Sequence, residues 1–490
     1  YLGFSHRFNE NSTVDVTAYA SKDEFRFSDQ FGFLWNNYLI NTRWQSHANR
    51  KVSPLLSLSF GRFENTRFEP TGVAASSVEN TMNYFHLKET LNYIPTEQHD
   101  IKTGIGVIGY LPGDEMKTGF NGNALVTSKR SGKSSGIEWA VFINDEFEWS
   151  ENISVSAGLR FSHYFHLGPD TTYKYFGDEM VRSRVSDTLH HGAGEIIKAF
   201  GGLEPRLSIR VKLRENQSLK AGYNRMIQYI HLISNTTAPT PVDIWQVSTE
   251  HTPPQLADNY SIGYFWNLKD NAWETSAEVF YKDMKSLVEY KDFAELLLND
   301  HLETELLSGK GRAWGTELFI RRLKGRWTGW LSYTFSRTEV MVSSPVQSES
   351  VNNGEWFPSN YDKPHTVNLV LNKQLGRKGA FSLIFSYNTG RPFTAIESSY
   401  ITNGTVVPVY SDRNAHRISD YWRTDVSITI GNVLKKVDDS LVFSLYNIFG
   451  RENAYSVFYQ RPSSRFFIPK PYKLSVLGAA FPSLSYNFRF

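Results

Sequence analysis

The feature that most constrains the fold is a strict alternation of apolar and polar residues across the segment 259–282. On either side of the polar turn Lys269-Asp270-Asn271, every second residue is mostly apolar or aromatic. These positions are Tyr260, Ile262, Tyr264, Trp266 and Leu268 before the turn, and Trp273, Thr275, Ala277, Val279 and Tyr281 after it. Because a β-strand turns successive side chains to opposite faces, this period of two predicts a β-hairpin with one apolar and one polar face.

The residues at the two ends of the apolar face indicate strands that cross a membrane. Aromatic residues bracket this face on both strands, and aromatic rings are enriched where a strand meets the two interfaces of a lipid layer. The opposite face carries charge, which suits a water-filled lumen better than a dry core. A half-buried strand of a soluble protein also alternates, so one hairpin leaves both interpretations open. The same pattern recurs along nearly the whole chain.

The composition agrees with a membrane barrel and excludes several other classes. Aromatic residues make up 15% of the 490 residues, and the mean hydropathy is −0.40 with no long apolar run. No transmembrane helix is predicted, as expected when only every second residue faces lipid. The net charge is +2 without a basic block, which argues against a nucleic-acid partner. The absence of cysteine excludes disulfides, zinc–thiolate sites and cysteine nucleophiles.

Short turns and long polar segments alternate along the chain. The short turns fall near residues 48–52, 95–100, 149–152, 214–217, 269–271, 323–326, 375–378 and 435–440. The long segments fall near 67–78, 111–133, 167–200, 232–254, 291–308, 342–360 and 392–418. This asymmetry is typical of an outer-membrane up-and-down antiparallel β-barrel, with short periplasmic turns and long extracellular loops. The spacing predicts about nineteen strands, and since bacterial barrels have an even number, we expect N-terminal strands to be missing.

The final residues predict a strand that carries an assembly signal. Leu484, Tyr486, Phe488 and Phe490 alternate with polar residues, and the sequence stops on an aromatic ring. We therefore expect Tyr486, Phe488 and Phe490 to be recognised by the barrel assembly machinery of the outer membrane. The alternative is an edge strand of a soluble sandwich, but the agreement of the preceding strands favours the barrel.

Several short segments, in their order and spacing, resemble a known family. They are 156–160 (SAGLR), 203–207 (LEPRL), 218–223 (SLKAGY), 228–231 (QYIH), 311–317 (GRAWGTE), 361–365 (YDKPH), 389–392 (TGRP), 421–425 (YWRTD), 446–449 (YNIF) and 486–490 (YNFRF). With these segments the chain resembles the TonB-dependent outer-membrane receptors, most closely those of Bacteroidetes-type bacteria. The resemblance extends from about residue 134 to the end, and more loosely before it.

The resemblance implies a barrel of about 22 strands, filled by an N-terminal plug that binds a TonB-type energy-transducing complex. The sequence departs from that pattern, because no plug and no first strands are found. We thus expect residues 1–490 to form one barrel domain whose first strand corresponds to about the fourth of the family. The implied function is active import of a nutrient or metal chelate, such as a siderophore or oligosaccharide, by an integral protein of the bacterial outer membrane. Implied partners are the TonB complex through the plug, outer-membrane lipids, a small-molecule substrate and a surface lipoprotein.

Charged residues on predicted strands are the candidate site residues. An Arg or Lys facing lipid at the midplane costs ~2–4 kcal/mol, so we expect these charges to face the lumen. The candidates are Arg160, Glu204, Arg206, Arg210, Glu317, Arg423 and Asp425. They would line the lumen or hold the plug by charge-assisted hydrogen bonds. The alternative is a hydrated wall with weak cross-strand ion pairs.

No motif predicts a catalytic, metal or cofactor site. His163, His166, His190 and His191 lie near one predicted strand end, but their spacing matches no ligand motif, which favours a solvated loop. No Gly-x-Ser-x-Gly elbow is present, so no enzyme activity and no cofactor are predicted. The sequence leaves the substrate-binding residues unidentified. A passive porin-like channel and an outer-membrane enzyme remain the alternatives to active import.

Overall fold

The structure is a computed structural model of the 490-residue chain. It describes all residues except 28–30, 48, 50, 70–74, 114, 120–128, 132–133, 178, 234–243, 297, 377, 404, 432, 435–437, 461–469, 476 and 490. Within the described part, none of the helices is long and apolar enough to cross a membrane. The helices found there are 3-10 turns of three residues each: η1 (Arg182–Arg184), η2 (Leu302–Thr304), η3 (Gln347–Glu349) and η4 (Asn352–Gly354).

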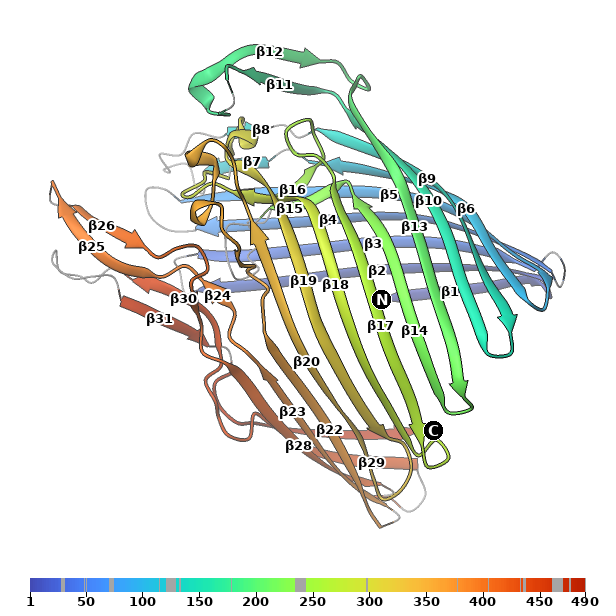
Figure 1. The fold of residues 1–490 in the computed structure, drawn as a ribbon. Coiled ribbons are helices and arrows are strands. Elements are labelled where there is room, and N and C mark those ends of the chain that lie inside the picture. Colours follow the sequence, from blue (N-terminus) through green and yellow to red (C-terminus); the bar gives the residue numbers. More distant parts are fainter. Residues whose placement is uncertain are drawn as a thin grey trace.

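One large antiparallel sheet forms the body of the molecule (Figure 1). It contains 22 strands, and three of these are short pieces beside longer ones: β7 (Glu115–Gly119), β8 (Lys129–Ser131) and β21 (Phe357–Pro358). The remaining nineteen are β1 (Leu2–Asn9), β2 (Ser12–Phe27), β3 (Phe31–Ser46), β4 (Val52–Glu69), β5 (Ser76–Thr96), β6 (His99–Pro112), β9 (Ser135–Ser150), β10 (Ile153–Leu167), β13 (Ile196–Arg214), β14 (Gln217–Gln228), β17 (Gln255–Leu268), β18 (Trp273–Tyr290), β19 (Leu306–Arg322), β20 (Trp327–Met341), β22 (His365–Leu375), β23 (Gly379–Asn388), β28 (Tyr421–Gly431), β29 (Asp438–Tyr446) and β32 (Phe481–Arg489). The all-β fold and the strand number expected from the sequence are confirmed.

Each long strand pairs with the next long strand along the chain, so the sheet is an up-and-down meander that curves around a central space (Figure 1). The sheet has two free edges among the described residues, since β1 pairs with β2 alone and β32 pairs with β29 alone. The hairpin predicted from residues 259–282 is formed by β17 and β18, with Ile262 opposite Val279 and Gly263 opposite Glu278. Its three turn residues all have positive φ angles, between 50° and 58°.

The two ends of the sheet differ as the turn pattern predicts. At one end, which we name the turn end, β9–β10, β13–β14, β17–β18 and β19–β20 are joined by two to four residues. At the opposite end, the loop end, long connections carry small hairpins of their own (Figure 1). These elements are β11 (Asp170–Tyr175) with β12 (Val185–His191), β15 (Ile230–Ile233) with β16 (Ile244–Val247), β24 (Pro392–Phe393) with β27 (His416–Arg417), β25 (Ile396–Thr402) with β26 (Thr405–Tyr410), and β30 (Ala454–Gln460) with β31 (Lys470–Ser475).

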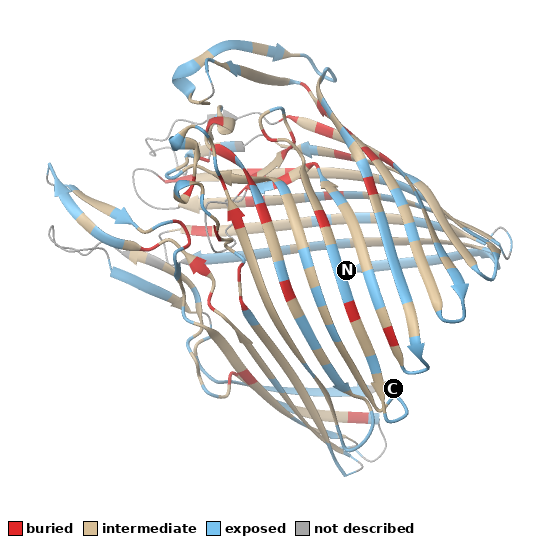
Figure 2. Cartoon of the chain, in the orientation of Figure 1, coloured by how far each residue is buried: buried red, intermediate tan, exposed pale blue. Residues whose placement is uncertain are grey.

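Large apolar side chains are exposed on the outer face of the sheet. On β17 and β18 the exposed fractions are 48% for Tyr260, 46% for Ile262, 46% for Val279 and 43% for Tyr281. Soluble monomers rarely expose contiguous apolar surface on this scale, so the outer face fits contact with lipid. Buried residues gather instead towards the loop end (Figure 2). There Tyr164, Tyr229 and Val247 form one of three small apolar clusters.

The connection after β14 folds inward. Its hairpin β15–β16 contacts β6, and the rings of Tyr164 and Tyr229 stack with centroids 5.0 Å apart. His231 is buried and bonds Ser248 Oγ through Nε2 at 2.9 Å. The sequence placed residues 232–254 among the long loops without indicating this inward fold. The sequence signal for this fold is the apolar pair Ile233 and Ile244, which are buried here and which a solvated loop would not need.

Candidate functional site

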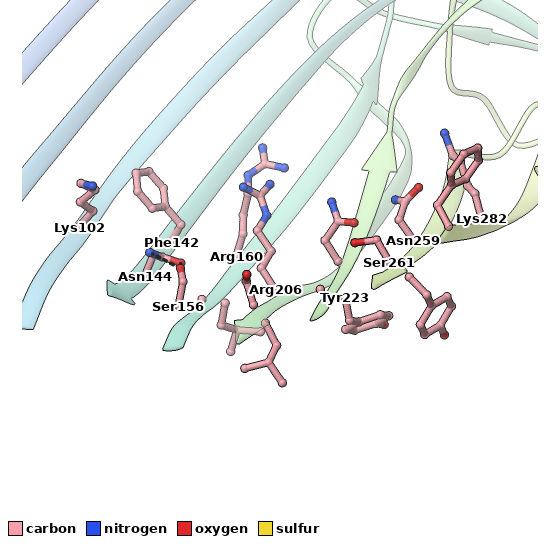
Figure 3. A pocket seen from close by; sticks show the side chains of 18 of the residues that line it. Lys102, Phe142, Asn144, Ser156, Arg160, Arg206, Tyr223, Asn259, Ser261 and Lys282 are labelled. Carbon is pink, nitrogen blue, oxygen red and sulfur yellow. Dashed lines mark hydrogen bonds between the residues drawn. The ribbon is translucent and has the colours of Figure 1, made fainter. Parts of the chain in front are cut away.

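A cavity of about 1000 Å³, which we name the large cavity, lies on the inner face of the sheet across strands β5 to β19 (Figure 3). The polar side chains that line it alternate with the apolar residues of the outer face. Figure 3 shows Lys102, Arg160, Arg206 and Lys282 with their charged ends on this inner side. The period of two therefore turns these charges towards the cavity, which apolar side chains such as Phe142 also line.

Arg160 lies at the centre of a buried polar network. Its guanidinium donates to Glu138 Oε1 through Nη2 and to Glu204 Oε1 through Nη1, both at 2.5 Å. The Tyr110 hydroxyl donates to Glu138 Oε2 at 3.0 Å, and the Ser162 hydroxyl donates to Glu204 Oε1 at 2.7 Å. Glu138 is 5% exposed and Glu204 1% exposed. The single Arg160 charge is thus shared by two buried carboxylates, and hydrogen bonds stabilise both.

Strand register explains how this network forms. Arg160 on β10 lies opposite Glu204 on β13, and Gly158 lies opposite Arg206 in the same pair of strands. The sequence pattern predicted the inward direction of these residues. It gave no indication of Glu138, which belongs to β9 and reaches Arg160 only through the β9–β10 register.

Other charges of the large cavity are without a described partner. Neither Arg206 nor Lys282 makes an ion pair with another residue of the described chain, and the same is true of Glu278 and Glu317. All four side chains line the cavity. Three of the seven candidates, Arg160, Arg206 and Glu317, therefore meet at one site, while Glu204 lies behind it. Their role in contacting a plug or substrate stays a prediction.

The remaining three candidates lie elsewhere on the sheet. Arg210 lines a cavity of about 310 Å³ near the turn end, beside Lys220 on the neighbouring strand. Arg423 donates through Nε to Asp425 Oδ2 at 3.0 Å, and its guanidinium lies 4.4 Å from the centre of the Tyr446 ring. Arg423 also lines a third cavity, of about 560 Å³, near the loop end. The candidates are thus divided among three sites.

The predicted assembly signal lies in the last strand. The Tyr486 and Phe488 rings stack with centroids 6.0 Å apart, and the Tyr486 hydroxyl donates to Asp439 Oδ2 at 2.8 Å. Phe490 lies outside the described residues. Recognition of these residues by an assembly machinery stays a prediction.

The histidines near the loop end have different surroundings. His191 contacts Thr172 Oγ1 at 3.0 Å and Glu195 Oε1 at 2.9 Å, while His190 contacts Thr171 Oγ1 at 3.1 Å. Across the residues that the structure describes, no group of three or more His, Asp and Glu side chains is arranged to hold a metal ion. Tyr175 of the same hairpin donates to the Glu303 carboxylate, and burial, followed by this contact, raises the pKa of its hydroxyl.

Comparison with known proteins gives one family and many similar folds. The family model described as "TonB dependent receptor-like, beta-barrel" matches residues 1–448. The copper transporter OprC has 9% identity and a TM-score of 0.66, over 100% of this chain and 71% of its own. The ferric-catecholate import receptor Fiu from K12 E. coli has 12% identity and a TM-score of 0.60, over 100% and 79%.

A third similar structure is BauA, the ferric preacinetobactin receptor from Acinetobacter baumannii. It has 10% identity and a TM-score of 0.65, over 99% of this chain and 71% of its own. No curated protein matches the chain.

Proposed function

Because this chain belongs to the TonB-dependent receptor β-barrel family, we propose that it forms the barrel of a receptor that actively imports a small molecule across the bacterial outer membrane. The family match over residues 1–448 is the observation that carries the proposal. The sheet supports it physically, since its apolar outer face suits lipid and its charged inner face suits a hydrated path. The chemistry is binding and gated passage, with no covalent bond broken.

The proposed substrate is a nutrient or metal chelate, such as a siderophore or an oligosaccharide. Two of the similar structures are named as receptors for ferric chelates, and a third is named as a copper transporter. The large cavity offers unpaired charges of both signs, from Arg206 and Lys282 and from Glu278 and Glu317. Such a wall can contact a polar ligand or a plug through charge-assisted hydrogen bonds.

Energised import needs a partner that transmits force. We propose that a plug domain lies against the inner face of the barrel formed by residues 1–490, and that the TonB complex acts through this plug. Further proposed partners are the assembly machinery, acting on Tyr486, Phe488 and Phe490, and a surface lipoprotein at the loop end. The proposed location is integral to the outer membrane, with the loop end outside the cell.

A growth experiment tests this function. Strains lacking the receptor, the TonB protein or neither are grown with single ferric chelates as the iron source and with single oligosaccharides as the carbon source. We expect at least one compound to support growth only when both proteins are present. Receptor-dependent growth that persists without TonB would instead support the passive channel.

A further inference from the structure

One row of directly opposed residues crosses the inner face of the sheet from β13 to β19. The strand register aligns Arg210 with Lys220 and Lys220 with Gly263. It then aligns Gly263 with Glu278, and Glu278 with Glu317. The row therefore carries two neighbouring cations, a glycine and two neighbouring anions, in that order. We name it the charge row after these five residues.

Nearly all residues around the charge row are uncharged. Ser154 of β10 lies beside one end of the row and Thr334 of β20 beside the other. The next row towards the loop end consists of Ser208, Gly222, Ser261, Phe280 and Gly315. The next row towards the turn end consists of Lys212, Ser218, Phe265, Ser276 and Phe319. The one charge in these two rows belongs to Lys212, which pairs with Glu215 at 2.9 Å. The neighbouring rows thus supply no counter-charge.

The charges of the row do not neutralise one another. Arg210, Lys220, Glu278 and Glu317 form no ion pair with any described residue. The two cations line the cavity of about 310 Å³, and the two carboxylates line the large cavity. The Lys220 ammonium lies 4.4 Å from the centre of the Phe265 ring, on the side of the turn end. The basic half and the acidic half of the row are therefore separate.

This order of charges is unfavourable for the sheet itself. Like charges directly opposite each other on adjacent strands destabilise a sheet, whereas opposite charges stabilise it. The charge row contains one repulsive pair at each end, and alternation of the same residues would have given attractive pairs. Natural sequences break such local rules mainly at functional sites. A bound molecule that supplies both counter-charges accounts for the arrangement.

The geometry of the row defines that molecule. The basic half can donate charge-assisted hydrogen bonds to one carboxylate, and the acidic half can accept them from one ammonium group. The centres of the two halves lie three strand spacings apart, which at roughly 4.8 Å per spacing is about 14 Å. An extended peptide rises roughly 3.3 Å per residue, so about four or five residues place its two charged ends at this separation.

We propose that the charge row binds a short linear peptide with two free ends. Its terminal carboxylate lies between Arg210 and Lys220. Its terminal ammonium lies between Glu278 and Glu317. Hydroxyl groups and aromatic rings beside the row are available to the rest of the peptide, from Ser208, Ser261, Phe265 and Phe280. This inference rests on the proposed function and narrows its substrate class to zwitterionic oligopeptides.

Calorimetric titration of the purified protein in detergent tests the site. The probe is penta-alanine with both ends free. Its controls are the same peptide acetylated at the amino end and the same peptide amidated at the carboxyl end. We expect penta-alanine to bind and each blocked peptide to bind roughly tenfold more weakly, since each loses one charge-assisted contact. Dialanine is too short to reach both halves and should bind no better than a blocked peptide.

Two double variants assign each end of the peptide to one half of the row. In Arg210→Gln with Lys220→Gln, amidation of the peptide should no longer weaken binding, because the carboxylate has lost its partners. In Glu278→Gln with Glu317→Gln, acetylation should no longer weaken binding, because the ammonium has lost its partners. Each double variant removes a repulsive pair and is expected to fold. Circular dichroism and heat-dependent gel mobility establish that it does.

The matched control is Glu274→Gln, which should bind all of the peptides as the unmodified protein does. Glu274 lies on the same strand, β18, but already pairs with Arg321 at 3.6 Å. Equal weakening by Glu274→Gln and by the acidic double variant would contradict the proposed position of the ammonium.

The outcomes separate this inference from the proposed function. Absence of penta-alanine binding up to about 10 mM, or equal affinity for the free and the blocked peptides, overturns the peptide site. The same absence is expected if another part of the protein covers the charge row. TonB-dependent growth on some compound would then still stand. Conversely, peptide binding without TonB-dependent growth supports the site and refutes active import.

Discussion

Glu278 of β18 lies directly opposite Glu317 of β19 on the inner face of the sheet, and neither carboxylate has a partner among the described residues. Like charges directly opposite each other on adjacent strands destabilise a sheet. The pair therefore weakens the wall at the large cavity. Arg206 and Lys282 line the same cavity but form no ion pair with either carboxylate among the described residues.

Substitution Glu317→Gln should raise the stability of the purified protein by about 0.5 kcal/mol, because it removes this repulsion from a solvated surface. Thermal unfolding in detergent measures the effect. Glu339→Gln is the control on the next strand and should lower stability, since Glu339 accepts the Arg312 Nε–H at 2.8 Å and forms an ion pair with the same guanidinium. A loss of stability in Glu317→Gln would indicate that Glu317 has a partner in the lumen.

Substitution Arg160→Met should lower the free energy of unfolding by about 3–5 kcal/mol, because it leaves two buried carboxylates without their counter-charge. Denaturant titration of the protein in detergent gives this value. Arg206→Met is the matched control and should change stability little, since Arg206 has no ion pair in the described chain. Adding Glu138→Gln and Glu204→Gln to Arg160→Met should recover most of the loss. Equal effects of Arg160→Met and Arg206→Met would contradict the network.

Single cysteines should report which face of the sheet meets water. The protein contains no cysteine, so Ser261→Cys and Ile262→Cys can each be labelled without background. Ser261 lines the large cavity, whereas Ile262 is exposed on the outer face. A water-soluble thiol reagent applied to membranes should label the cysteine at 261 and leave that at 262 unlabelled. Equal labelling would contradict a lipid-facing outer surface.

The inward hairpin β15–β16 should lose stability in mild acid. His231 lies in this hairpin, outside the strands that span the membrane, and burial lowers its pKa from 6.5 to about 4. Because the folded pKa is depressed, the unfolded state binds a proton first, and stability falls as the pH drops below 6.5 towards 4. We expect a loss of about 2 kcal/mol between about pH 7 and pH 5.

Hydrogen exchange of the segments 229–233 and 244–248, corrected for the intrinsic rate, measures this loss. His231→Gln removes the titrating group and should abolish the pH dependence while leaving the hairpin in place. Persistence of the same pH dependence in His231→Gln would assign it to another group.

Most of what could be predicted from the sequence came from the alternation of apolar and polar residues with a period of two. It located the β17–β18 hairpin with its turn at residues 269–271 and gave the number of long strands, because alternation is a local property. It also placed Arg160, Arg206 and Glu317 on the inner face, where all three line one cavity. These predictions require only that each side chain is assigned to one face of its strand.

Contacts between distant residues could not be predicted in this way. Arg160 meets Glu138 through strand register, and Lys363 meets Arg391 through the folding of two connections at the loop end. The inward position of β15–β16 depends on packing between Tyr164 and Tyr229, which are 65 residues apart by their numbers. Long-range packing of this kind has no signature in the local pattern of one sequence.

The lengths of the strands have a consequence for where a ligand first meets the protein. β5 has 21 residues and β13 has 19, whereas a tilted strand needs only about 9–11 residues to cross a bilayer. At roughly 3.3 Å per residue and a tilt near 45°, the surplus extends about 20 Å beyond the hydrocarbon layer. In an outer membrane, these additional strand residues would form a stiff rim of hydrogen-bonded strands above the lipid headgroups. A bulky solute would then be oriented by a rigid rim in bulk water before it reached the depth of the acyl chains.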